Sequence, residues 1–82
     1  MHTILIHGDD YATAHDLHDA LRRLLRLPDH YGHNADALYD CLSERLETVN
    51  LTVLGPVNSD VQSALRKCAA VIQDLGGTVT GL

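Results

Sequence analysis

The chain is poor in cationic side chains and contains neither tryptophan nor phenylalanine. Six Lys and Arg residues stand against eleven Asp and Glu in 82 residues, which gives a formal net charge of -5. Proteins that hold nucleic acid through its phosphates need clustered cations, so this balance argues against direct nucleic-acid binding. A basic protein is the partner that the charge favours.

Long apolar runs are also absent. No stretch approaches the roughly 20 apolar residues that cross a bilayer, and the N-terminus has no cationic segment followed by an apolar one. We therefore expect a cytoplasmic protein that does not bind membranes. A chain this short buries only about 60% of its unfolded surface, so one core and a single domain over residues 1–82 are expected.

Cysteine is scarce, with only Cys41 and Cys68 in the sequence. Each falls on the apolar side of an expected helix, and no secretion signal places them in an oxidising compartment. No cationic neighbour on those sides would lower a thiol pKa. We expect two reduced core residues, and a disulfide is the alternative.

Three strand-like segments alternate with segments of helical spacing. Strands are expected at residues 3–7, 48–54 and 78–82, where β-branched and apolar residues dominate. Residues 3–7, with Leu5 between Ile4 and Ile6, suit a buried strand. The expected helices run between Thr13 and Pro28, from Asn34 to about Leu46, and from Ser59 to Gly76.

Capping boxes support two of these helix starts, Thr13 with Asp16 and Ser59 with Gln62. The resulting order is β, α, α, β, α, β. Strands joined by helical crossovers imply a parallel sheet with right-handed connections. The sequence therefore predicts an α/β fold of two layers, in which a three-stranded parallel sheet packs against about three helices.

The second helix has an acidic side and an apolar side. At about 100° per residue, four acids fall within one quadrant: Asp36, Asp40, Glu44 and Glu47. The opposite side carries Leu38, Cys41, Leu42 and Leu46. Burying the apolar side therefore places the acids in solvent. Like charges four residues apart slightly destabilise a helix, so helix stability does not explain them.

Two interpretations of the acidic side stay open, a solvated face of an acidic protein and a binding face. Tyr39 lies at the edge of the acids and is one of only three aromatic residues. An amphipathic ring beside charges is common in interfaces and favours the binding face, although a half-buried core tyrosine would also suit the pattern. The preceding loop adds His30 and Tyr31, and loop and helix could form one surface.

The loop and the second helix also carry a long specific pattern. Residues 27–42 read Leu-Pro-Asp-His-Tyr-Gly-His-Asn-Ala-Asp-Ala-Leu-Tyr-Asp-Cys-Leu, and Asp-Leu-His precedes them at residues 16–18. The combination of a Leu-Pro-acid-aromatic loop, Gly-x-Asn and Asp-Ala-Leu-aromatic-Asp-Cys-Leu resembles the core signature of the barstar family. The strong part of the resemblance covers about a third of the chain.

This resemblance implies a barstar-like fold and an intracellular inhibitor of a barnase-like microbial ribonuclease, with an antitoxin or immunity role. In such inhibitors the loop and helix enter the active site, where carboxylates take the place of RNA phosphates. By position, Asp40 is the central carboxylate and Asp36 its companion. The other implied contacts are His30, Tyr31, Asn34, Ala35, Tyr39 and Glu44. The implied partner is a basic extracellular-type ribonuclease or a related nuclease toxin.

Several positions depart from the family pattern. His30 replaces the usual tyrosine, Tyr39 replaces a tryptophan, and Glu44-Arg45 stands where the pattern has Gly-Trp. The segment between Leu54 and Ser59 is too short for an extra helix. Val71 or a neighbour stands where the family has an interface glutamate, so no site is carried over there. The alternative is a barstar-fold module that neutralises a different toxin or another basic protein.

Paired histidines suggest a third function class, a metal-dependent hydrolase. His15 and His18 are one turn apart, and His30 and His33 repeat that spacing. No third ligand has an assured position, so solvated or interface histidines are favoured and no cofactor is expected. Asp36 and Asp40 lack a paired base or nucleophile, so we do not expect an enzyme.

Overall fold

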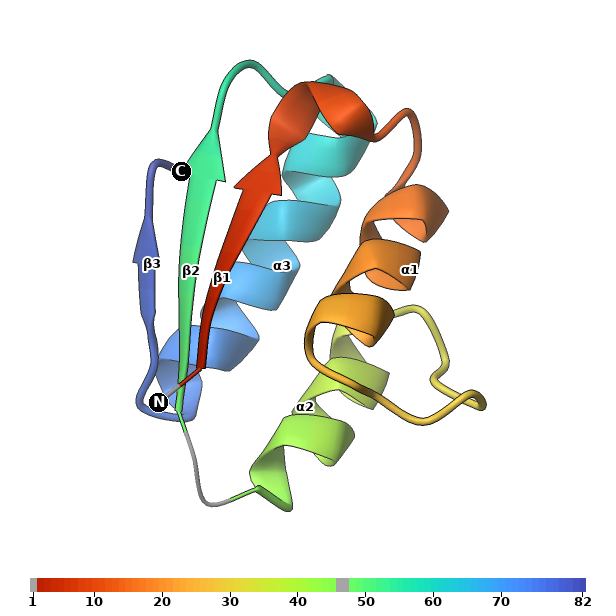
Figure 1. Ribbon diagram of the computed structural model, residues 1–82, viewed down its shortest axis with the longest axis vertical. Coiled ribbons are helices and arrows are strands. Elements are labelled where there is room, and N and C mark those ends of the chain that lie inside the picture. The colour runs from red at the N-terminus through yellow and green to blue at the C-terminus, as the bar shows by residue number, and fades with distance from the viewer. Residues whose placement is uncertain (1, 46–47) are drawn as a thin grey trace.

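A parallel sheet forms one layer of the protein and helices form the other (Figure 1). The computed structural model describes residues 2–45 and 48–82. The strands, in order across the sheet, are β1 (His2–His7), β2 (Val49–Leu54) and β3 (Thr78–Thr80). Both pairings are parallel, with Ile4 opposite Leu51 and Leu51 opposite Val79. Parallel neighbours need crossover connections, which the helices supply.

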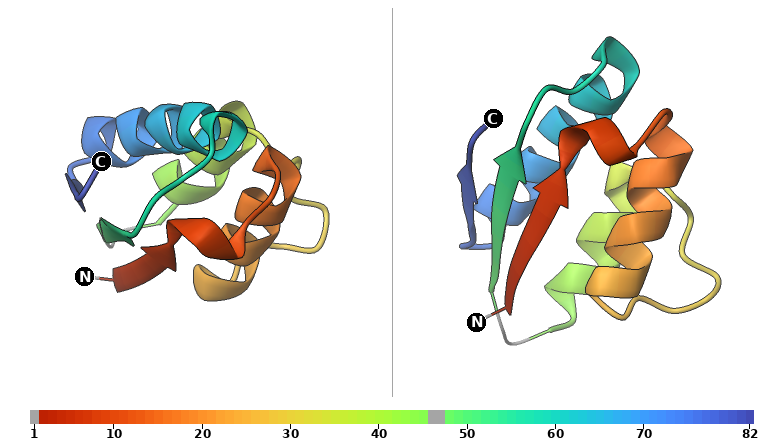
Figure 2. Two further views of the ribbon diagram at one scale, coloured as in Figure 1. Left: turned by 90° about the horizontal axis from the view of Figure 1, so that it is seen from above. Right: turned by 45° about the horizontal axis from the view of Figure 1, so that its top comes forward.

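Three helices cover the same face of the sheet, α1 (Ala14–Leu24), α2 (Ala35–Ser43) and α3 (Ser59–Asp74) (Figure 2). A short 3-10 helix, η1 (Gly8–Asp10), follows directly on the end of β1. Helix α3 is central because it contacts α1, α2, β2 and β3. The predicted α/β fold, with three helices on a three-stranded parallel sheet, is confirmed in the described residues.

One predicted N-cap is confirmed and another is wrong, although α3 begins at Ser59 as expected. The Thr13 hydroxyl accepts a hydrogen bond from the Asp16 amide at 3.1 Å, as the capping box requires. The cap of α3 is Asn58 and not Ser59, because the Asn58 side-chain oxygen accepts from the Val61 amide at 2.8 Å. The Asn58 amide group also donates to a backbone carbonyl just before α1, a distant contact that no local pattern reveals.

Other boundaries differ by a few residues. Helix α2 ends at Ser43, whereas the sequence predicts an end near Leu46, which lies outside the described residues. Strand β3 stops at Thr80, short of the predicted Leu82. The segment between β2 and α3 contains no helix, as its shortness predicts.

Strand β1 is buried on one side only. Ile4 and Ile6 point into the core, but Leu5 is 46% exposed. The sequence-based expectation of a buried strand is therefore wrong for Leu5. The reason is the one-sided packing of helices, since alternate residues of a strand point to opposite faces of the sheet.

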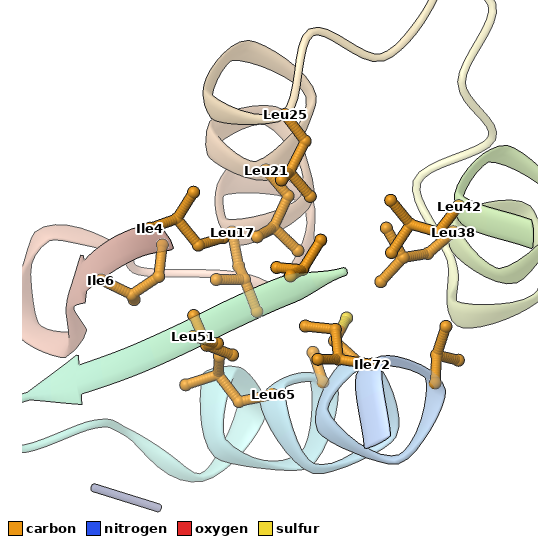
Figure 3. Packing of buried hydrophobic residues seen from close by; sticks show 14 of the residues in the cluster. Ile4, Ile6, Leu17, Leu21, Leu25, Leu38, Leu42, Leu51, Leu65 and Ile72 are labelled. Carbon is orange, nitrogen blue, oxygen red and sulfur yellow. The ribbon is translucent and has the colours of Figure 1, made fainter. Parts of the chain in front are cut away.

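The core lies between the sheet and the three helices (Figure 3). Its fully buried side chains include Leu17, Leu21, Leu38, Leu65 and Ile72. Burial of one such side chain contributes about 1.5–3 kcal/mol. Both cysteines are free thiols, as expected. Cys68 is a core residue, but Cys41 is only partly buried, because it packs at the edge of the core and also lines the surface beside Asp40. Within residues 2–45 and 48–82, no helix is both long enough and apolar enough to cross a membrane.

Replacing Leu38 by alanine should lower the free energy of unfolding by about 2–5 kcal/mol, because it leaves a cavity between α2 and α3. The matched substitution Leu5→Ala on the open face of the sheet should lower it by no more than about 1 kcal/mol. Urea denaturation followed by circular dichroism measures both. Equal losses would contradict the one-sided core.

Candidate functional site

Helix α2 packs one side on α3 and shows the other side to solvent. Leu38 and Leu42 are 0% and 5% exposed, and the helix contacts α3 through this side. Asp36, Asp40 and Glu44 are all exposed. The separation of acids from leucines that the helical spacing predicts is thus present over the described turns of α2.

The exposed acids of α2 have no ion-pair partner within the described parts of the chain. The arginine nearest in sequence, Arg45, instead donates from its guanidinium to the carbonyl oxygen of Arg26 at 3.0 Å. Arg22 is engaged elsewhere, with Asp19 at 3.6 Å and Asp29 at 3.4 Å. The acidic side of α2 therefore keeps its charge available for an external cation. The fourth predicted acid, Glu47, lies outside the described residues.

The loop before α2 and the helix itself share a shallow groove. Its lining comprises Pro28, His30, Asp40, Cys41, Glu44 and Arg45. His30 is exposed at this groove, and Tyr39 on the neighbouring turn is 46% exposed. Loop and helix thus form one surface, as expected from their adjacency in sequence.

The first turn of α2 is held by Asn34. Its side-chain oxygen accepts from the Ala37 amide at 2.8 Å, and its side-chain nitrogen donates to the Gly32 carbonyl at 3.1 Å. Asp36 lies in this first turn, where the free amides of the helix stabilise a negative charge. Asn34 remains exposed and Ala35 is half-buried. The cap therefore fixes where the acidic side begins.

The side chain of Tyr31 is buried, whereas a residue that contacts a partner through its side chain must reach the surface. Tyr31 is only 4% exposed, and its hydroxyl lies 2.7 Å from His18 Nδ1 and 3.3 Å from the Asn34 carbonyl oxygen. The assignment of Tyr31 as a partner contact is not supported by this burial, which gives the ring an internal role. Burial raises the pKa of the Tyr31 phenol well above its usual value.

His18 is buried, at 4% exposure, whereas the sequence predicts a solvated or interfacial histidine. Burial lowers the pKa of His18, and nearby His33 and His15 lower it further. The missed signal is its helix face, because Leu21 and Leu25 follow His18 at three and seven residues.

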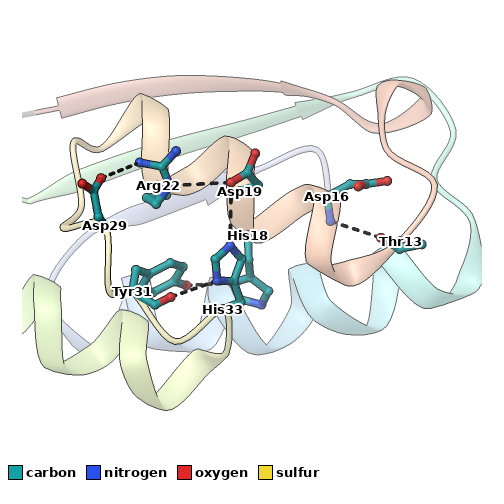
Figure 4. Close-up of polar contacts among 8 residues, drawn as sticks. All are labelled: Thr13, Asp16, His18, Asp19, Arg22, Asp29, Tyr31 and His33. Carbon is teal, nitrogen blue, oxygen red and sulfur yellow. Dashed lines mark hydrogen bonds and ion pairs between the residues drawn. The ribbon is translucent and has the colours of Figure 1, made fainter.

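His33 joins the loop to α1 next to His18 and Tyr31 (Figure 4). Its ring stacks parallel on His15 with centroids 4.3 Å apart, and its Nδ1 donates to the Tyr31 carbonyl oxygen at 2.9 Å. Its Nε2 lies 3.7 Å from a carboxylate oxygen of Asp19. The backbone of His33 is left-handed at φ 54°, a conformation that histidine adopts more readily than most residues.

The histidines do not assemble a metal site in the described residues. No group of three potential ligands comes together there. The parallel stacking of His15 and His33 also points their ring nitrogens along the ring planes and not toward a shared ion between the rings. The gathered histidines therefore act as packing and hydrogen-bonding groups around the loop.

Replacing Asp40 by asparagine should leave the free energy of unfolding unchanged or raise it by up to about 0.5 kcal/mol. The substitution relieves like-charge repulsion with Asp36 and Glu44 and breaks no ion pair in the described structure. Urea denaturation measures the change. A loss above about 1 kcal/mol would show that Asp40 supports the fold itself.

The fold and the exposed helix define an α/β protein with a preformed anionic face. The profile of the family described as "Barstar (barnase inhibitor)" matches residues 1–77. The chain therefore belongs to the barstar family, which consists of inhibitors and not enzymes. This confirms both the resemblance read from the sequence and the expectation of a protein without catalytic activity.

One relative covers almost the same length. The chain is 34% identical, over an alignment of 85 positions, to "Putative ribonuclease inhibitor YrdF" of Bacillus subtilis (strain 168). The alignment includes 90% of this chain and 92% of that protein. The similarity thus extends well beyond the third of the chain that carries the recognisable motif.

Proposed function

We propose that this protein inhibits a barnase-like microbial ribonuclease by placing the acidic side of α2 and the preceding loop over a cationic active site. The observation that carries the proposal is that Asp36 and Asp40 lie one turn apart, exposed and free of internal ion pairs in the described structure. The family description and the name of the relative both support a role as a ribonuclease inhibitor.

A ribonuclease active site offers Arg, Lys and His side chains arranged for phosphate. Carboxylates on a rigid helix can accept charge-assisted and often bidentate hydrogen bonds from the same groups. Because α2 is already held by its core leucines and by Asn34, its acids lose little conformational freedom on binding. Preorganisation therefore offsets part of the desolvation penalty that charged groups pay in an interface.

The remaining contacts are proposed by position from the resemblance to the family, and all but the half-buried Ala35 are exposed around the two aspartates. Tyr39 is the aromatic anchor, since large amphipathic rings near the centre of an interface contribute most to affinity. His30 and Glu44 face the partner from the shared groove, and Asn34 and Ala35 from the start of the helix. The proposed partner is a basic extracellular-type ribonuclease or related nuclease toxin, neutralised in the cytoplasm of its producer.

A second candidate function is neutralisation of a different toxin or basic protein by the same face. Glu44 favours it, because this residue adds a carboxylate to the groove where the family pattern has glycine. A partner with a cation opposite Glu44 would be selected by that charge.

Asp40→Ala should weaken inhibition of barnase, the probe nuclease, by at least about 30-fold in the inhibition constant, the equivalent of about 2 kcal/mol at an interface hot spot. A suitable control is Asp10→Ala, which removes an exposed carboxylate from η1 at the opposite end of the molecule (Figure 1). The control should inhibit as the parent does.

The outcomes of this assay separate the candidates. If Asp40→Ala inhibits as well as the parent, the assignment of the central carboxylate is wrong. A folded parent protein that leaves barnase fully active would reject that enzyme as a target and favour the second candidate.

Association with barnase should be fast at low salt and should slow at least about tenfold between 20 mM and 500 mM salt, because screening weakens the attraction between an acidic and a basic face. The double variant Asp36→Asn with Glu44→Gln should show a smaller salt dependence, whereas Asp10→Ala should keep that of the parent. Stopped-flow fluorescence of barnase measures the rates. A salt-independent parent rate would argue against electrostatic steering.

A further inference from the structure

A line of buried polar groups joins α3 to the first turn of α2. We propose that Cys68, His18 and Tyr31 form a hydrogen-bond relay of fixed direction that positions the acidic helix. This inference rests on the proposed function, because it identifies the residues that set the geometry of the inhibitory face. The side chains of all three are buried in the free chain, so we assign them as positioning residues and not as partner contacts.

The relay ends on the carbonyl group with which α2 begins. The Tyr31 hydroxyl lies 3.3 Å from the Asn34 carbonyl oxygen, which also accepts from the Leu38 amide at 3.0 Å. The same residue caps the helix through its side chain. The core therefore holds the first turn of α2 by a contact independent of its apolar packing.

The direction of the relay follows from what each group can donate. In the proposed relay the single hydroxyl proton of Tyr31 is assigned to the Asn34 carbonyl oxygen, which can only accept. With that assignment, His18 Nδ1, at 2.7 Å from the hydroxyl, is the donor to Tyr31. The neutral ring therefore carries its lone pair on Nε2, which faces the Cys68 sulfur at 4.0 Å, and the thiol donates to it.

The titration behaviour of the three groups is consistent with this arrangement. Burial raises the pKa of the Cys68 thiol to about 12, so the thiol keeps its proton. Burial likewise keeps the Tyr31 phenol protonated and lowers the pKa of His18, which stays neutral. The thiol and the phenol therefore keep the protons that the relay requires, and the neutral imidazole carries one proton, which the relay assigns to Nδ1.

Protonation of His18 would break the relay at one end. A proton on Nε2 removes the acceptor that faces the Cys68 thiol. The neighbouring groups do not act in one direction on a positive charge at His18. His15 and His33 disfavour it. Asp60 and Lys67 of α3 line the pocket beside His18, and their opposite charges favour and disfavour it respectively.

The first test is the tautomer of His18 in the free protein. Nitrogen-15 NMR of the imidazole at pH 7.5 should show the proton on Nδ1. A proton on Nε2 would overturn the relay, because the hydroxyl of Tyr31 would then donate to His18 and not to Asn34.

The second test compares Tyr31→Phe with Tyr11→Phe, a control at a partly buried tyrosine for which no hydroxyl hydrogen bond is found in the described structure. Amide hydrogen exchange at Leu38 should be at least about tenfold faster in Tyr31→Phe relative to an α1 amide such as Leu21. Tyr11→Phe should leave this ratio unchanged. An unchanged ratio in Tyr31→Phe would refute the positioning role.

The third test is the pH profile of stability. Since the pKa of His18 is lowered on folding, the unfolded chain takes up the proton first as the pH falls below about 6.5. The folded-to-unfolded ratio of the parent should therefore fall with decreasing pH, relative to His18→Asn, by up to about tenfold per pH unit. Asparagine keeps a donor near Nδ1 and does not titrate. Parallel profiles for the two proteins would contradict the inference.

Inhibition of barnase separates failure of the relay from failure of the proposed function. If both are correct, Tyr31→Phe should raise the inhibition constant by at least about fivefold, and Tyr11→Phe should not. If the three tests on the free chain succeed but the parent fails to inhibit barnase, the proposed target falls and the relay stands. If Tyr31→Phe inhibits as the parent does, the relay does not set the inhibitory geometry.

Discussion

The rotation of α2 about its own axis is the constraint on which the candidate site depends. Leu38 and Leu42 bury against α3, and once they are buried the helix can present Asp36 and Asp40 only to solvent. Stability and binding charge therefore come from opposite sides of one short helix. Like-charge repulsion between the acids is worth a few tenths of a kcal/mol, small beside the burial of two leucines.

The loop before α2 supports the candidate site both through a side chain that is buried in the core and through a side chain that is exposed at the surface. Tyr31 points into the core and meets His18, while His30 stays at the groove beside Asp40. A loop that only covered the surface would leave the start of α2 free to fray. The buried phenol instead ties the Asn34 carbonyl to α1 and, through His18, to α3. Such polar networks rigidify a site when every member is satisfied.

The one-sided sheet separates the molecule into a packed layer and an open face. Val71 of α3 is buried at 9% exposure and does not extend the acidic surface. The proposed site lies on α2 and its loop, while Leu5 and Leu54 remain exposed on the opposite side of the sheet.

The sequence by itself determined the order of strands and helices, the cap at Thr13 and the acidic side of α2, because these depend on residues within one or two turns of each other. Tertiary structure alone decided that Tyr31 and His18 are buried partners, that Asn58 caps α3, and that Leu5 is exposed. Those outcomes require knowing which distant segments pack together. Periodicity shows that a face is apolar, but the layer that covers it decides which polar groups go inside.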